Sequence, residues 1–85
     1  MELTVTAKYK ATKKHPDARY IKNLSEVLTY SDIYSFDDCY DDLESNISYA
    51  VRDILLVVSG GYTVSRDYFK SLKIKVNGNL VLNWN

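Results

Sequence analysis

The chain has 85 residues, of which 46% are hydrophobic and 26% charged, with only three glycines and one proline. This composition argues against a disordered chain, and the length has room for one hydrophobic core, so we expect a single domain over residues 1–85. Eleven basic and eleven acidic side chains cancel to a net charge of zero. A neutral protein exerts no long-range attraction on nucleic acid or on anionic membranes.

The cysteine content and the apolar runs indicate where the protein resides. The single cysteine, Cys39, excludes an internal disulfide bond. The N-terminus has no apolar signal-peptide segment, and the longest apolar run, Ile54–Val58, is too short to cross a bilayer. We therefore expect a cytoplasmic protein without a membrane partner.

The first predicted element is a β-strand over residues 2–10, because apolar and polar side chains alternate there. The following segment, Ala11–Asp17, is polar and holds the only proline, which predicts a turn or loop. Residues 19–30 fit neither the helical nor the strand period well, although Glu26–Thr29 has enough β-forming residues to suggest a second strand.

One long amphipathic helix is predicted from about Ser35 to Val58. Ser35 is expected to cap its N-terminus, with Asp38 in place of the usual glutamate of a capping box. Apolar side chains then recur at spacings of three and four, as in a helix that packs on a core: Phe36, Tyr40, Leu43, Ile47, Ala50, Val51, Ile54 and Val58. Gly60 and Gly61 follow and are expected to end the helix.

Three further strands are predicted after the glycines. The first is a short strand at Tyr62–Ser65, and the other two form a hairpin over residues 72–84. Together these elements predict an α+β fold, with a small antiparallel sheet of about four to five strands and the helix on one face. The predicted order is β-β-α-β-β-β.

The hairpin allows two turns. Asn77-Gly78 resembles a two-residue type I′ turn, but such a turn would place lysines opposite leucines and mix the two faces of the sheet. A three-residue loop at Val76–Gly78, with a bulge at the glycine, pairs Ile74 with Leu80 instead. We therefore predict the three-residue loop.

Catalytic chemistry has little support in the sequence, and no catalytic residue, metal site or cofactor is predicted. His15, the only histidine, lies in a polar loop and is expected to be exposed. Cys39 is expected to behave as a small hydrophobic residue at the edge of the helix's apolar face. One histidine and one cysteine cannot form a zinc site, and the acidic run lacks the glycine-bearing loop of an EF-hand.

The strongest functional signal is the acidity of the first half of the predicted helix. Its exposed side would carry a run of carboxylates, from Asp37, Asp38, Asp41, Asp42 and Glu44. Acidic residues four positions apart on a helix repel each other, so helix stability alone does not favour this arrangement. One interpretation is a solvated surface that suits the helix dipole. The other is a surface that docks on a cationic site of a second protein, such as a site that normally holds nucleic acid.

The second half of the predicted helix carries more apolar surface than one face of a sheet can cover. Tyr49 and Leu56 fall on its polar side with Arg52 between them, and tyrosine and arginine are frequent binding hot spots. Either the N-terminal part of the chain covers this end, or a target protein or a second copy of the chain does.

A basic segment, Lys8–Lys22, supports an alternative function. Its cations are interleaved with Tyr9 and Tyr20, a pattern that suits nucleic acid: Lys8, Lys10, Lys13, Lys14, Arg19 and Lys22. Lysines on the solvent face of an edge strand also discourage aggregation without binding any ligand.

The sequence carries no motif of a known family. In composition it is similar to accessory proteins of phages and mobile elements, among them small nuclease inhibitors such as anti-CRISPR proteins. We therefore expect a non-enzymatic protein-binding module, an inhibitor that presents an acidic, nucleic-acid-like helix face. The alternatives are a nucleic-acid-binding accessory protein that uses the basic segment and a structural homo-oligomer.

Overall fold

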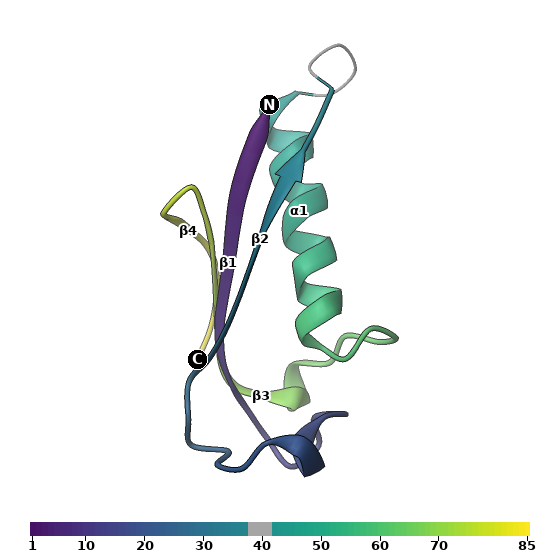
Figure 1. Cartoon of the computed structure of the whole chain (residues 1–85), viewed down its shortest axis with the longest axis vertical. Helices are drawn as coiled ribbons and strands as arrows, with labels where there is room; N and C mark the ends of the chain where they lie inside the picture. Colours follow the sequence, from purple (N-terminus) through teal and green to yellow (C-terminus); the bar gives the residue numbers. More distant parts are fainter. Residues whose placement is uncertain (38–41) are drawn as a thin grey trace.

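The computed structural model describes residues 1–37 and 42–85, which form one antiparallel sheet with one helix on it (Figure 1). The strands are β1 (Glu2–Ala11), β2 (Leu28–Ser35), β3 (Phe69–Val76) and β4 (Asn79–Trp84), and the sheet order is β2-β1-β3-β4. The helix is α1 (Leu43–Val58). Two short 3-10 turns complete the described chain, η1 (Ala18–Tyr20) and η2 (Arg66–Tyr68). The predicted α+β class is confirmed.

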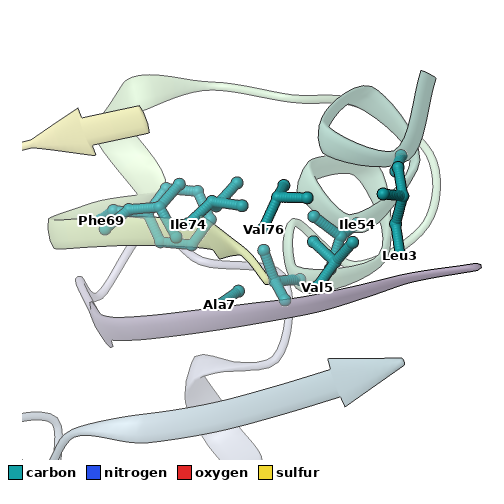
Figure 2. Packing of buried hydrophobic residues seen from close by; sticks show 10 residues of the cluster. Leu3, Val5, Ala7, Ile54, Phe69, Ile74 and Val76 are labelled. Carbon is teal, nitrogen blue, oxygen red and sulfur yellow. The ribbon is translucent and has the colours of Figure 1, made fainter. Parts of the chain in front are cut away.

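The core lies between α1 and the two inner strands, β1 and β3. Alternate residues of β1 point toward the helix, and the register places Val5 opposite Val76 and Ala7 opposite Ile74. Ile54 of α1 is fully buried above them, and Figure 2 shows these side chains meeting. Spacings of four in α1 bury one stripe of the helix: Asn46, Ala50, Ile54 and Val58.

The helix begins at Leu43, so the predicted start at Ser35 is wrong. Ser35 is the last residue of β2, where it pairs with Glu2, and the backbone N–H of Phe36 donates to the Met1 carbonyl at 2.8 Å. The backbone N–H and C=O groups of Phe36 are therefore paired with Met1 and are not available for the first turn of a helix. Asp42 caps α1 instead, because its Oδ1 accepts from the Ser45 N–H at 2.7 Å. Asp38, the other half of the predicted capping box, lies outside the described residues.

The second strand lies later than predicted, over Leu28–Ser35 instead of Glu26–Thr29. β2 is an edge strand and most of its side chains are exposed, so its alternation of apolar and polar residues is weak. Ile33 points to the face opposite the helix and is 60% exposed, whereas Tyr34 points toward the helix and is half-buried. The sequence alone therefore did not predict the bounds of β2, because its weak alternation becomes clear only once its pairing with β1 is known.

Beyond α1 the chain contains no strand at Tyr62–Ser65, and the predicted one there is wrong. The helix ends in a Schellman motif, in which the Gly60 N–H donates to the Val57 carbonyl and the Gly61 N–H to the Leu56 carbonyl. Gly60 has a φ of +98°, which a residue with a side chain rarely adopts. The chain then continues as an irregular loop to η2.

The hairpin between β3 and β4 uses the two-residue turn, so the predicted three-residue loop is wrong. Asn77 and Gly78 have φ values of 49° and 85°, as a type I′ turn requires. With this turn, an unbroken β4 would mix lysines and leucines on one face of the sheet, and a bulge inside β4 avoids this for Leu82. Ile74 pairs with Leu82 while Lys75 pairs with Leu80, so Val81 is an extra residue in a bulge.

His15, in the polar loop after β1, is only 4% exposed, so the prediction that it is exposed to solvent is wrong. Its Nε2 lies 2.7 Å from the Val58 carbonyl at the end of α1, and its Nδ1 accepts from the Asp17 N–H at 3.0 Å. The ring also stacks on Tyr9. This histidine fastens residues 12–17 to the C-terminal end of the helix.

Candidate functional site

The outward side of α1, opposite its buried stripe, is where predicted site residues meet. Tyr49 is 60% exposed, Arg52 is exposed and Leu56 is half-buried. Tyr49, Arg52 and Leu56 line a hollow of about 240 Å³ together with Asp53 and Val64. Val64 comes from the loop after the helix, 43% exposed, and it was missed because only the folded loop brings it back beside α1.

A second hollow adjoins the first at the N-terminal end of the helix. It measures about 420 Å³ and is lined by Glu44, Ser45, Ser48, Tyr49 and Arg52. Tyr49 and Arg52 line both hollows, so the two hollows form one continuous surface with these two side chains between them. We call the five residues Glu44, Tyr49, Arg52, Leu56 and Val64 the helix surface.

The side chains around the helix surface are held by contacts with β2 and with the segment after it. The Tyr49 ring meets the Phe36 ring edge-on, with centroids 5.8 Å apart. The Tyr34 hydroxyl donates to Asp53 Oδ2 at 2.7 Å, which ties the edge strand to the helix. Partial burial and this bond both raise the pKa of Tyr34 above its usual value of 10.0, which favours the protonated hydroxyl that donates to Asp53.

Within the described residues, the carboxylates of the predicted acidic helix face do not lie together on one helix. Asp37 lies between β2 and α1, and Asp42 precedes the helix as its cap. Hydrogen bonds from Ser45 lower the pKa of the Asp42 carboxyl, so this charge supports the helix end. Asp38 and Asp41 lie outside the described residues. In the described chain, only Glu44 of the five predicted carboxylates lies within α1 itself.

The predicted basic segment divides between two places. Lys8 and Lys10 lie on β1, and their side chains point to the face of the sheet opposite α1. The others belong to the loop between β1 and β2, where the Lys14 Nζ is 4.0 Å from Asp67 and the Arg19 guanidinium lies 4.8 Å above the Tyr20 ring. Lys13 and Lys22 are exposed in that same loop.

The described residues offer no group of three or more histidine, cysteine, aspartate or glutamate side chains able to hold a metal ion. Both ring nitrogens of His15 already have backbone partners, so this side chain has no free nitrogen for proton transfer. Cys39 lies outside the described residues. Within residues 1–37 and 42–85, no helix is long and apolar enough to cross a membrane.

Comparison with protein-family models, with curated proteins and with solved structures found no match to this chain. Its function is therefore inferred from the surface that the fold builds.

Proposed function

We propose that the chain is a non-enzymatic protein-binding module that binds its partner with the helix surface. The observation that carries the proposal is the shared lining of the two adjoining hollows by Tyr49 and Arg52, with Leu56 and Val64 beside them. Tyrosine and arginine are, with tryptophan, the residue types enriched at the energetic centre of protein interfaces. An exposed apolar hollow on a helix suits an inserted side chain of a partner.

The chemistry of the helix surface defines the partner. An apolar side chain would fill the hollow between Leu56 and Val64. Arg52 forms no ion pair with any residue of the described chain, so its five N–H donors are available to a carboxylate of the partner. Glu44 would face a cation. We propose that the module inhibits its partner in this complex, because it occupies a surface that the partner needs for its own ligand.

The test compares two tyrosine and arginine pairs on the same protein. Tagged protein captures the partner from a lysate of the cells that encode the chain, the partner is identified by mass spectrometry, and its dissociation constant is then measured with purified protein. Replacing both hot-spot residues, Tyr49→Ala with Arg52→Ala, should raise the dissociation constant by about thirtyfold or more, as the loss of about 2 kcal/mol does.

The matched control is Arg19→Ala with Tyr20→Ala, which removes an exposed arginine and tyrosine from the loop between β1 and β2. This variant should bind as the unaltered protein does. If the control loses the partner and the Tyr49 and Arg52 variant keeps it, the helix surface is not the binding site. Thermal melting of both variants confirms that they are folded.

A further inference from the structure

The middle of the sheet face opposite α1 is polar and rich in lysine, and exposed Ile33 and Leu80 lie beside it on the two edge strands. Alternation along the strands places Thr4, Thr6 and Lys8 of β1 on this face, and the register aligns Thr6 and Lys8 with Lys75 and Lys73 of β3. Neighbouring positions of β2 add hydroxyl groups, and the Ser31 and Thr6 hydroxyls are 2.9 Å apart. Figure 1 shows α1 on one side of the sheet only.

The lysines on this face are brought together by strand pairing. Lys8 lies directly opposite Lys73, and Thr6 lies directly opposite Lys75. These four side chains line a hollow of about 220 Å³. Lys10 follows on the same face of β1, opposite Ser71. We call Thr6, Lys8, Lys10, Lys73 and Lys75 the lysine face.

Stability does not account for this arrangement. Like charges directly opposite each other on neighbouring strands are destabilising. Lysines that guard against aggregation belong on edge strands, but β1 and β3 are the two inner strands of the sheet. Within the described chain, none of the four lysines of the lysine face forms an ion pair with a carboxylate. Their ammonium groups are therefore available to an anion from outside the protein.

We propose that the lysine face binds the phosphate backbone of double-stranded nucleic acid without reading its sequence. Ammonium and hydroxyl groups are the usual partners of backbone phosphate oxygens. Single strands are normally held by aromatic side chains that stack on bases, and the aromatic residues of the described strands point elsewhere. Tyr9, Tyr30, Tyr34 and Trp84 lie on the side of the sheet that faces α1.

This binding site is on the other side of the sheet from the helix surface, so it goes beyond the proposed function and does not depend on it. Because the whole protein is neutral, the local lysines alone provide the attraction, and the affinity should be modest and sensitive to salt. Contact of about three lysines with phosphates predicts that the logarithm of the binding constant falls with the logarithm of salt concentration with a slope of about −3.

The test is fluorescence anisotropy with a labelled, mixed-sequence DNA duplex, titrated at several salt concentrations. The triple variant Lys8→Gln, Lys73→Gln and Lys75→Gln should weaken binding by about tenfold or more at low salt and bring the slope close to zero. The variant with arginine at the same three positions should bind as the unaltered protein does, since it keeps the charge. Both variants should remain folded, because these side chains are exposed.

The matched control replaces three lysines of the loop between β1 and β2, as Lys13→Gln, Lys14→Gln and Lys22→Gln. It has the same net charge as the triple variant and should retain duplex binding. An equal loss in the two sets would overturn the proposal, since general charge would then explain binding. Tighter binding of the single strand than of the duplex would also overturn it, and so would binding of phosphatidylserine vesicles without binding of DNA.

Discussion

His15 joins the loop after β1 to the end of the helix through both of its ring nitrogens. The Asp17 N–H donates to Nδ1, which assigns the proton to Nε2 and makes Nε2 the donor to the Val58 carbonyl. The ring is packed between the Tyr9 ring, stacked at 6.1 Å, and the edges of Tyr68 and Phe69. One side chain thus satisfies a helix-end carbonyl and closes the core at this end of the molecule.

Two substitutions separate the hydrogen bonds of His15 from its packing. His15→Ala loses both and should lower the free energy of unfolding by about 3 kcal/mol. His15→Phe keeps a ring in the cavity but leaves two backbone groups unpaired, so its cost should be smaller, about 1–2 kcal/mol. Urea denaturation measures both values. A phenylalanine variant as stable as the unaltered protein would show that these hydrogen bonds contribute nothing.

At the scale of single residues, the sequence predicted those whose role depends on local spacing. Tyr49, Arg52 and Leu56 were grouped because they lie within two turns of one helix, and they do line one hollow. The burial of His15 was not predictable, since its neighbours in the chain are polar and its partner Val58 is 43 residues away. Lys8 and Lys73 likewise become neighbours only through the pairing of β1 with β3.

Among the elements, α1 shows how competition between structures decides a boundary. The segment from Ser35 carries a helix-capping pattern, yet the chain continues β2 to Ser35 and starts the helix at Leu43. Pairing with β1 outweighs the local signal, because it satisfies backbone groups over the whole strand. From Ile47 to Val58 the helix follows the predicted period, since there the apolar stripe packs on the sheet, whereas Leu43 of the predicted stripe is 53% exposed.

The charge of the Asp42 cap makes the helix sensitive to acid. Its pKa is lowered in the folded state by the hydrogen bonds from Ser45, so its contribution to stability is complete above the ordinary value of 3.8 and is lost as the pH falls below it. Asp42→Asn keeps a capping oxygen without the charge. The melting temperature of the unaltered protein should exceed that of this variant at neutral pH, and the difference should shrink in strong acid.

Thermal melting at a series of pH values checks this expectation, with Asp42→Ala as the control that removes the cap entirely. The alanine variant should melt at the lowest temperature at neutral pH. A difference between the aspartate and asparagine proteins that does not change with pH would contradict a charged cap.

The β3–β4 hairpin shows what periodicity alone could and could not decide. The positions of both strands followed from alternation and from Asn77-Gly78. The register did not, because alternation assumes an unbroken ladder and β4 contains a bulge at Val81. The sequence signal for the turn was correct, and the conflict between faces that argued against it is absorbed by one extra residue.

The whole molecule measures 43 × 24 × 18 Å and presents two unlike faces. On one side of the sheet lies α1 (Figure 1). It carries the helix surface, where a polar hollow and an apolar hollow share Tyr49 and Arg52. On the other side lies the lysine face, with ammonium and hydroxyl groups only around its hollow. The zero net charge of the sequence hides this division, because it sums over faces that the fold separates. The α+β fold class was predictable from the order of the predicted helix and strands. The side chains that lie together on each face of the sheet were not, because they depend on the strand register.

Site-specific photo-crosslinking tests the binding of a protein partner by the helix surface most directly. A benzophenone side chain replaces Ser48, an exposed residue that lines the hollow beside Tyr49 and Arg52, in one protein. It replaces Ser31, on the opposite side of the sheet, in another, and both proteins are irradiated in lysate of the encoding cells. We expect an adduct with a different protein from position 48 and none from position 31. An adduct from position 31 alone, or an adduct of twice the mass of the chain from position 48, would contradict this binding site.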